Sequence, residues 1–121
     1  MFGGLFGGSD KAMHPAWIQL SGLDQLNKIK EDSYQKTQVL FKHSTRCPTS
    51  TMAYSRLENG WDKKSDVADF HYLDLIRYRD VSNEIANMFS VRHESPQLLV
   101  IKNGVCELNA SHNQVSVDLV R

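Results

Sequence analysis

Short β-prone apolar runs alternate along the chain with segments whose apolar residues recur at helical spacing, and this alternation restricts the fold more than any other feature. The β-prone runs cover residues 17–20, 39–41, 70–76, 98–101 and 105–108. Between them, helical spacing occurs at Leu23, Leu26 and Ile29, at Ala53, Leu57 and Trp61, and at Val81, Ile85, Met88 and Phe89. Ser21, with Asp24 three residues later, marks the expected start of the first helix. The pattern predicts an α/β domain.

The last two β-prone runs flank Asn103 and Gly104, which is the strongest short signal for a β-hairpin. The tail at residues 113–120 fits two patterns. Val115, Val117 and Leu119 alternate as in a strand, whereas Val115 and Leu119 alone also fit a short helix. We favour the helix, because it would cover one face of the sheet.

The predicted order of elements is therefore β-α-β-α-β-α-β-β-α. Strands that are joined through helices are expected to be parallel with right-handed crossovers, and the last two strands to form an antiparallel hairpin. A central mixed sheet with helices on both faces follows. The 121 residues fit one domain, placed at residues 16–121, and the glycine-rich residues 1–15 are expected to form a flexible leader. A small hydrophobic docking tag is the alternative for the leader.

Charge and hydropathy exclude several classes of protein. Lysine plus arginine and aspartate plus glutamate each number 14, so the formal net charge is 0, and no basic run is present. This argues against binding nucleic acid mainly through phosphates. No apolar run approaches the ~20 residues that span a bilayer, so we expect no membrane partner. With only two cysteines and no basic, apolar export signal, the expected compartment is the cytoplasm.

The most informative chemical feature is Cys47, which follows a predicted buried strand and a short polar loop and precedes a predicted helix. The sulfur is therefore expected at a helix N-terminus, where free backbone N–H groups and the helix dipole favour negative charge. Pro48 fits the first helical position, and Arg46 adds a positive charge nearby. Together these features predict a thiol that reacts as the thiolate, rather than a small packed residue.

A dithiol oxidoreductase needs a resolving cysteine three residues after the first, and this position holds Ser50. A serine cannot form the internal disulfide. A mixed disulfide at Cys47 must then be released by an outside thiol, or by Cys106 if the geometry allows it. The histidines and two cysteines match no tight metal-ligand spacing, so no metal site is expected.

A second informative feature is the Ser95-Pro96 pair directly before the β-prone run at 98–101. Proline can lead a strand but cannot sit within its hydrogen-bonded ladder, so the placement is consistent with a strand start. The default expectation for such a bond is trans.

Four segments together resemble the monothiol bacilliredoxin family of the thioredoxin superfamily. They are FKHSTRCPTS at residues 41–50, YRDVSNEIA at 78–86, VRHESPQ at 91–97 and ASH at 110–112. The resemblance extends roughly over residues 17–119. It implies a thioredoxin-like fold, and it implies that Pro96 is cis and faces the active cysteine.

The resemblance also implies an activity. Cys47 would attack a mixed disulfide between a protein and a low-molecular-weight thiol, such as bacillithiol or an equivalent, which serves as co-substrate without any tightly bound cofactor. The partners would be S-thiolated proteins and the small thiol, and the chain is expected to be a monomer. Ser95 would pair with an extended substrate. The residues expected to bind substrate are Thr45, Arg46, Pro48, Ser95 and Pro96.

Two residues are assigned possible auxiliary roles, and two other functions stay open. Ser50 replaces the resolving cysteine, and His93, just before Ser95-Pro96, could transfer protons or make a structural hydrogen bond. One alternative function is a non-catalytic thioredoxin-like module that binds extended peptides beside Pro96. The other is a redox sensor in which oxidation of Cys47 alters a partner interaction.

Overall fold

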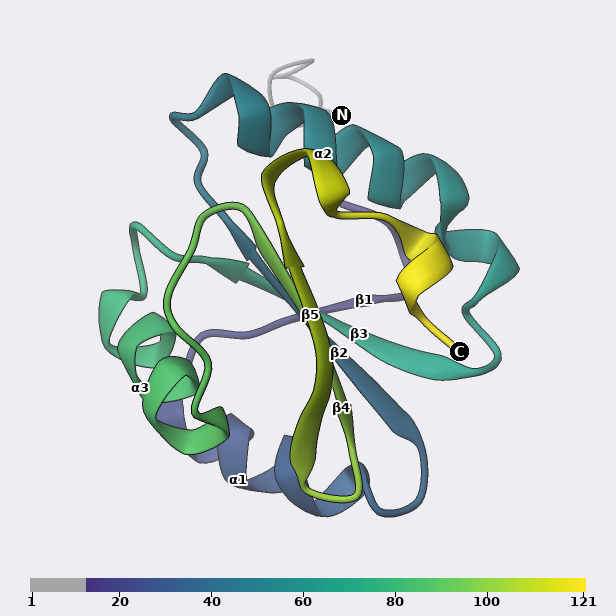
Figure 1. The fold of residues 1–121 in the computed structure, drawn as a ribbon, viewed down its shortest axis with the longest axis vertical. Coiled ribbons are helices and arrows are strands. Elements are labelled where there is room, and N and C mark those ends of the chain that lie inside the picture. Colours follow the sequence, from purple (N-terminus) through teal and green to yellow (C-terminus); the bar gives the residue numbers. More distant parts are fainter. Residues whose placement is uncertain (1–12) are drawn as a thin grey trace, which may run out of the picture.

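The computed structural model describes residues 13–121, which form a single mixed sheet covered by helices on both faces (Figure 1). The strands are β1 (Trp17–Gln19), β2 (Thr37–His43), β3 (Ala68–Asp74), β4 (Gln97–Lys102) and β5 (Val105–Ser111), in the spatial order β1-β3-β2-β4-β5. The α-helices are α1 (Leu23–Asp32), α2 (Pro48–Gly60) and α3 (Arg79–Phe89). Three single-turn 3-10 helices complete this part of the chain, namely η2 (Trp61–Lys63), η3 (His112–Gln114) and η4 (Val117–Leu119).

Alternate side chains of the central strand β2 enter two separate cores, as the two-sided burial of a central strand requires. Val39 and Phe41 pack with the buried residues of α2 and of the C-terminal segment. Leu40 packs on the opposite face with α1 and α3. Figure 1 shows α2 on one side of the sheet and α1 with α3 on the other. The predicted α/β architecture is confirmed.

The direction of β4 differs from the sequence prediction. The parallel pairings are β1 with β3 and β2 with β3, whereas β4 runs antiparallel to β2 although a helix precedes it. The register explains the difference, because Asp74 at the end of β3 and Gln97 at the start of β4 both lie at the His43 end of β2. The 11 residues of α3 lead away from this end, and residues 90–96 return to it. The connection therefore starts and finishes at one end of the sheet.

The predicted hairpin turn at Asn103 and Gly104 is confirmed. Both residues have positive φ, at 52° and 81°, which is the backbone of a two-residue hairpin turn. The turn is docked on the end of α1, where the Gly104 N–H donates to Oγ of Ser33 (2.8 Å). A Cβ atom at Gly104 would collide with the hydroxyl of Tyr34. The positive φ is the reason that this position favours glycine, since the exposed Tyr34 side chain could move away from a Cβ atom.

The predicted C-terminal helix is not formed, and the tail consists of η3 and η4 instead. Val115 and Val120 are fully buried against the α2 face. The Arg56 guanidinium donates to the Val115 carbonyl (3.1 Å) and to the His112 carbonyl (3.2 Å), and the His112 carbonyl also accepts from the Val115 N–H (3.3 Å), which closes the 3-10 turn η3. A short segment rich in β-branched residues has little helical stability of its own to oppose these contacts. The tail nevertheless covers the sheet face, as expected.

The N-terminal boundaries are also shifted. Helix α1 begins at Leu23 rather than at the Ser21 signature, and the Gln25 side chain accepts from the N–H groups of Ser21 and Gly22 (both 2.9 Å). Residues 1–12 of the predicted leader lie outside the described residues. Met13 packs against the core, and Nε2 of His14 lies 2.7 Å from Oδ1 of Asp62.

Within residues 13–121, no helix has the length and apolar character needed to cross a membrane.

Candidate active site

Cys47 is the N-cap residue of α2, with extended backbone angles (φ −110°, ψ 120°), and Pro48 follows as the first helical residue. Its N–H donates to the Ser44 carbonyl (3.2 Å), and its carbonyl accepts the first helical hydrogen bond from the Thr51 N–H (3.0 Å). The side chain is a free, partly buried thiol. The sulfur therefore lies at a helix N-terminus, where unpaired N–H groups and the helix dipole favour an anion. The position predicted from the sequence is confirmed.

The residue three positions after Cys47 is integrated into the structure behind the thiol. Ser50 is fully buried, and its Oγ accepts from the Ser44 N–H (2.9 Å) and shares a hydrogen bond with Nδ1 of His43 (2.7 Å). The hydroxyl thus holds the end of β2 against the first turn of α2. This position has a structural role and offers no sulfur for an internal disulfide.

The second cysteine lies far from the first. Cys106 pairs with Ile101 on β4, and Ile101 pairs with Gln38 near the start of β2, whereas Cys47 follows the end of β2 at His43. The two ends of that strand are on the order of 16 Å apart. Burial raises the pKa of the Cys106 thiol, whose Sγ donates to the Leu108 carbonyl (3.3 Å). The structure therefore does not bring Cys106 to Cys47.

A desolvated aromatic wall lies behind the first turn of α2. The His43 ring is 5.1 Å from the ring of Tyr54 and 5.7 Å from that of Tyr72. Burial lowers the pKa of His43 and raises the pKa of Tyr72 to about 12, because both charged forms would lose their hydration. These side chains are therefore uncharged at neutral pH, and the wall contributes no carboxylate or cation of its own.

The peptide bond between Ser95 and Pro96 is cis, as the resemblance implied. Gln97 pairs with Lys42, so Pro96, one residue earlier, lies at the level of His43 and close to the turn that carries Cys47. The Pro96 carbonyl accepts a hydrogen bond from the His112 N–H (3.0 Å), which connects the cis-proline to η3. The structure therefore brings Cys47 and the cis-proline to the same end of the sheet.

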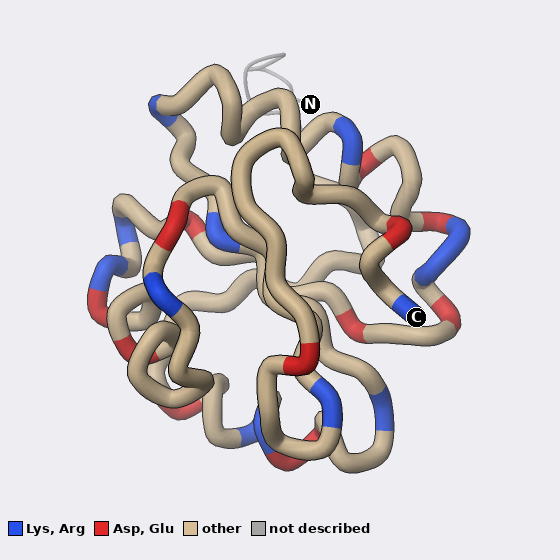
Figure 2. Tube along the Cα trace, viewed as in Figure 1, with Lys and Arg blue, Asp and Glu red and all other residues tan. Residues whose placement is uncertain are grey.

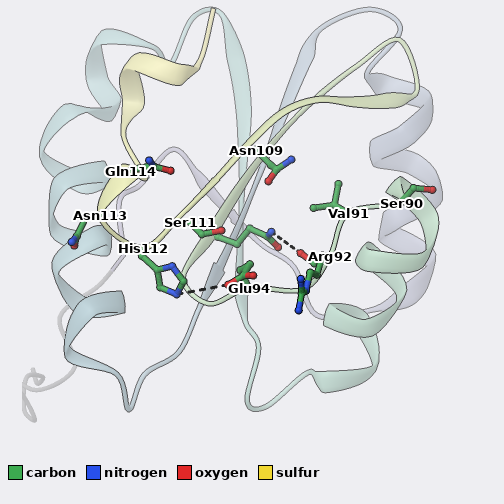
Figure 3. A pocket seen from close by; sticks show the side chains of 10 residues that line it. Ser90, Val91, Arg92, Glu94, Asn109, Ser111, His112, Asn113 and Gln114 are labelled. Carbon is green, nitrogen blue, oxygen red and sulfur yellow. Dashed lines mark hydrogen bonds and ion pairs between the residues drawn. The ribbon is translucent and has the colours of Figure 1, made fainter.

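Residues 91–95 are here called the pre-proline segment, and Val91, Arg92 and Glu94 of this segment line one side of a groove of about 710 Å³. Figure 3 shows Arg92 and Glu94 of this segment facing the groove opposite Ser111 and His112, at the end of β5. The Glu94 carboxylate lies 3.9 Å from Nε2 of His112. Six of the ten lining residues carry amide or hydroxyl side chains, which can donate and accept hydrogen bonds.

The remaining predicted site residues flank Cys47 at the surface. Thr45, Arg46 and Pro48 are exposed, and the side chains of Thr45 and Arg46 make no hydrogen bond or ion pair with the described residues. They are therefore free to contact a substrate. Lysine and arginine are interspersed with aspartate and glutamate along the chain (Figure 2). The described residues contain no cluster of three or more histidine, cysteine or acidic side chains that could hold a metal ion.

Sequence reasoning missed Lys42, which is fully buried beside this site. Its Nζ lies 3.1 Å from Nδ1 of His93 and donates to the Ser82 carbonyl (3.1 Å). Burial, with a smaller effect of the Arg79 charge, lowers the pKa of Lys42 to about 8. The pKa of His93 is lowered by burial and by the positive charges of Lys42 and Arg79. The ring is therefore neutral, and its Nδ1 can accept a hydrogen bond from Lys42. The available signal was the position of a lysine directly after the β-prone run at 39–41, ahead of the loop that leads to Cys47.

Comparison with known proteins agrees with this geometry. The profile of the family described as "Monothiol bacilliredoxin BrxC" matches residues 18–120. A solved structure described as "a putative oxidoreductase with a thioredoxin fold" is 33% identical, with a TM-score of 0.75, and the match covers 85% of this chain and 88% of that one.

More distant structures share the fold alone. Thioredoxin O2 from Arabidopsis thaliana in the oxidized state is 18% identical with a TM-score of 0.68, covering 88% of this chain and 90% of that one. Thioredoxin NaTrxh from Nicotiana alata is 21% identical with a TM-score of 0.66, covering 85% and 86%. The arrangement around Cys47 and Pro96 thus occurs within a thioredoxin fold.

Proposed function

The chain belongs to the monothiol bacilliredoxin family, and from this premise we propose that it removes a low-molecular-weight thiol from mixed disulfides on proteins, with Cys47 as nucleophile. The family and the fold support the coarser statement, a thiol–disulfide oxidoreductase. The observation that carries the finer one is the combination at α2 of Cys47 at the N-cap with Ser50, a hydroxyl, three residues later.

The proposed reaction has two exchanges. In the first, the Cys47 thiolate attacks the small-thiol sulfur of the protein mixed disulfide, a Cys47–small-thiol disulfide forms, and the protein thiolate leaves and takes up a proton. In the second, the thiolate of another small thiol attacks this disulfide, which regenerates Cys47 and releases the oxidised dimer of the small thiol. Two electrons pass from the small thiol to the protein. The oxidised dimer is then reduced elsewhere.

The second step needs an outside thiol because of where the sulfurs lie. Ser50 cannot resolve the intermediate, and Cys106 lies toward the opposite end of the sheet. The intermediate on Cys47 therefore persists until a second thiol arrives. Bacillithiol, or an equivalent thiol with a polar non-thiol end, is the co-substrate that the family name suggests.

Substrate contacts follow from the exposed positions around the thiol. Thr45, Arg46 and Pro48 would contact the small thiol or orient its sulfur, and Arg46 would favour an anionic group there. The backbone of Ser95, before the cis-proline, would pair with an extended segment of the protein substrate in the manner of an added strand. We propose a monomer that acts on S-thiolated proteins in the cytoplasm.

The direct test is transfer of the small thiol to Cys47 when no second thiol is supplied. A carrier protein with one cysteine in a mixed disulfide with bacillithiol is mixed with the reduced protein, quenched with acid and analysed by peptide mass spectrometry. The expected result is stoichiometric transfer of the bacillithiol mass to the Cys47 peptide and turnover once free bacillithiol is added. Binding of the carrier without transfer would support the peptide-binding module. Stoichiometric modification that added bacillithiol does not reverse would support the redox sensor.

A further inference from the structure

Lys42 is the least expected residue near the site, because it places an ammonium group inside the domain without a carboxylate partner. Its side chain is fully buried. Removing a charged amine from water is costly unless other groups replace its hydration. Among residues 13–121, no acidic group shifts the pKa of Lys42, and the one charge that influences it is the like charge of Arg79. A buried lysine at this position therefore lowers the stability of the fold. We expect its contacts to serve a purpose other than stability.

The contacts of Lys42 point to one segment. Nζ donates to the Ser82 carbonyl of α3 (3.1 Å) and to Nδ1 of His93 in the pre-proline segment (3.1 Å). Its strand neighbour Gln97, also buried, donates through Nε2 to the Arg92 carbonyl (2.9 Å), a bond drawn in Figure 3. Two adjacent buried side chains from the sheet thus hold two consecutive residues of this segment.

The segment itself contributes little to its own position. The side chains of Arg92 and His93 are exposed, and the backbone hydrogen bonds of the segment within the described residues are those of Val91 and Arg92. Ser95, at its end, lies within three residues of both contacts. Any displacement of His93 therefore moves the backbone that precedes Pro96.

We propose that Lys42, together with Gln97, is a positioning residue that fixes the pre-proline segment so that Ser95 meets the protein substrate. The proposal rests on the proposed function for the identity of the substrate, but not for the contact itself. Lys42 acts through His93 and does not touch the reacting sulfur. The buried charge is retained because it orders a substrate-binding segment at the expense of stability.

Methionine is the matched replacement, since it has a similar length, packs well in apolar surroundings and lacks the donor. Lys42→Met is compared with Lys63→Met, which removes the same charge from an exposed position on η2. Three quantities are measured. They are the rate of tryptic cleavage after Arg92, kcat/KM for a bacillithiol-modified carrier protein, and the rate of Cys47 alkylation by iodoacetamide.

The expected outcome separates positioning from a general structural role. Lys42→Met is expected to unfold at the same temperature as wild type or higher, yet to be cleaved several-fold faster after Arg92. Its kcat/KM for the carrier is expected to fall by about tenfold to a hundredfold, since small displacements of a positioning group have effects of that size. Alkylation of Cys47 is expected to stay within about twofold, because a small reagent does not need the segment. Lys63→Met should match wild type in all three.

Several results would overturn the proposal. One is wild-type cleavage after Arg92 in Lys42→Met, whatever its activity. Another is a loss of Cys47 alkylation in proportion to kcat/KM, because Lys42 would then act on the sulfur. If wild type itself fails to release bacillithiol, the proposed function is wrong. The rate of tryptic cleavage after Arg92, compared between wild type and Lys42→Met, then tests the positioning contact by itself. His93→Ala, at an exposed position, provides a second variant with the same expected effects on cleavage after Arg92, on kcat/KM and on alkylation of Cys47, should Lys42→Met not fold.

Discussion

The Oγ atom of Ser50 lies 2.7 Å from Nδ1 of His43, at the position where a dithiol oxidoreductase would carry its second sulfur. The same oxygen accepts the Ser44 N–H (2.9 Å). The hydroxyl therefore connects the last residue of β2, the loop that follows and the first turn of α2. Ser50 thus stabilises the turn that carries Cys47, and because it has no sulfur, it also prevents an internal disulfide at this position.

Ser50→Ala is expected to destabilise the domain by about 1–3 kcal/mol, because the Ser44 N–H and the His43 ring would lose a buried partner. Urea unfolding monitored by circular dichroism measures this loss. Ser55→Ala, at an exposed position on the same helix, provides the matched control. Equal stabilities for the two variants would show that the Ser50 hydroxyl does not hold the turn.

Cys47→Ser is expected to abolish release of the small thiol from a modified protein, whereas Cys106→Ser should retain most of the wild-type rate. The reason is that Cys106 lies on β5 near the hairpin, toward the opposite end of the sheet from Cys47. Release is followed by mass spectrometry of the carrier protein. Full activity in Cys47→Ser would exclude the mechanism, and inactivity in Cys106→Ser would assign a role to the second thiol.

The stability of wild type relative to Lys42→Met is expected to depend on alkaline pH. The pKa of Lys42 falls from 10.5 to about 8 on folding, so the stabilising share of this group is present above pH 10.5 and is lost as the pH falls through 8. At neutral pH the buried ammonium therefore costs up to about 3 kcal/mol relative to its neutral form. Urea unfolding between pH 7 and 10 tests this, and a constant difference between the two proteins would contradict it.

Acid is expected to destabilise the domain through His71. This side chain is 6% exposed, its Nε2 lies 2.7 Å from Oε1 of Gln38, and burial lowers its pKa from 6.5 to about 4. The neutral ring stabilises the fold fully above pH 6.5, and this share, up to about 3 kcal/mol, is lost as the pH falls through 4. Between pH 7 and pH 4, the free energy of unfolding should therefore fall more for wild type than for His71→Gln, as urea unfolding would measure. Parallel curves would refute the assignment.

Local patterns predicted those elements whose signals are local. Asn103 and Gly104 require positive φ, and the structure has it at both positions. A helix accommodates the missing N–H of a proline best in its first turn, and α2 begins at Pro48. Cys47 and the cis bond before Pro96 accordingly lie where the sequence and the family resemblance placed them.

The failed predictions depend on contacts between distant residues. The antiparallel direction of β4 follows from the return of residues 90–96 to the end of the sheet at which β3 finishes, and no periodicity encodes that return. The tail forms η3 and η4, and its carbonyls at His112 and Val115 accept from Arg56, which is more than fifty residues away. Lys42 was overlooked because a lysine ordinarily indicates a solvent-exposed position. Along the chain, α2, β3 and the start of α3 separate Lys42 from Ser82, and the rest of α3 also lies between Lys42 and His93.

The central claim is that Cys47 is the reactive nucleophile at the N-terminus of α2, and the rates of alkylation of the two cysteines at neutral pH test it most directly. Cys106 provides the internal control, because burial raises its pKa. Iodoacetamide labelling of the native protein, resolved by peptide mass spectrometry, gives both rates in one sample. Cys47 is expected to label much faster than Cys106, because its thiol lies at a helix N-terminus whereas the Cys106 thiol is desolvated. A Cys47 that labels no faster than Cys106 would contradict this mechanism and favour the peptide-binding module.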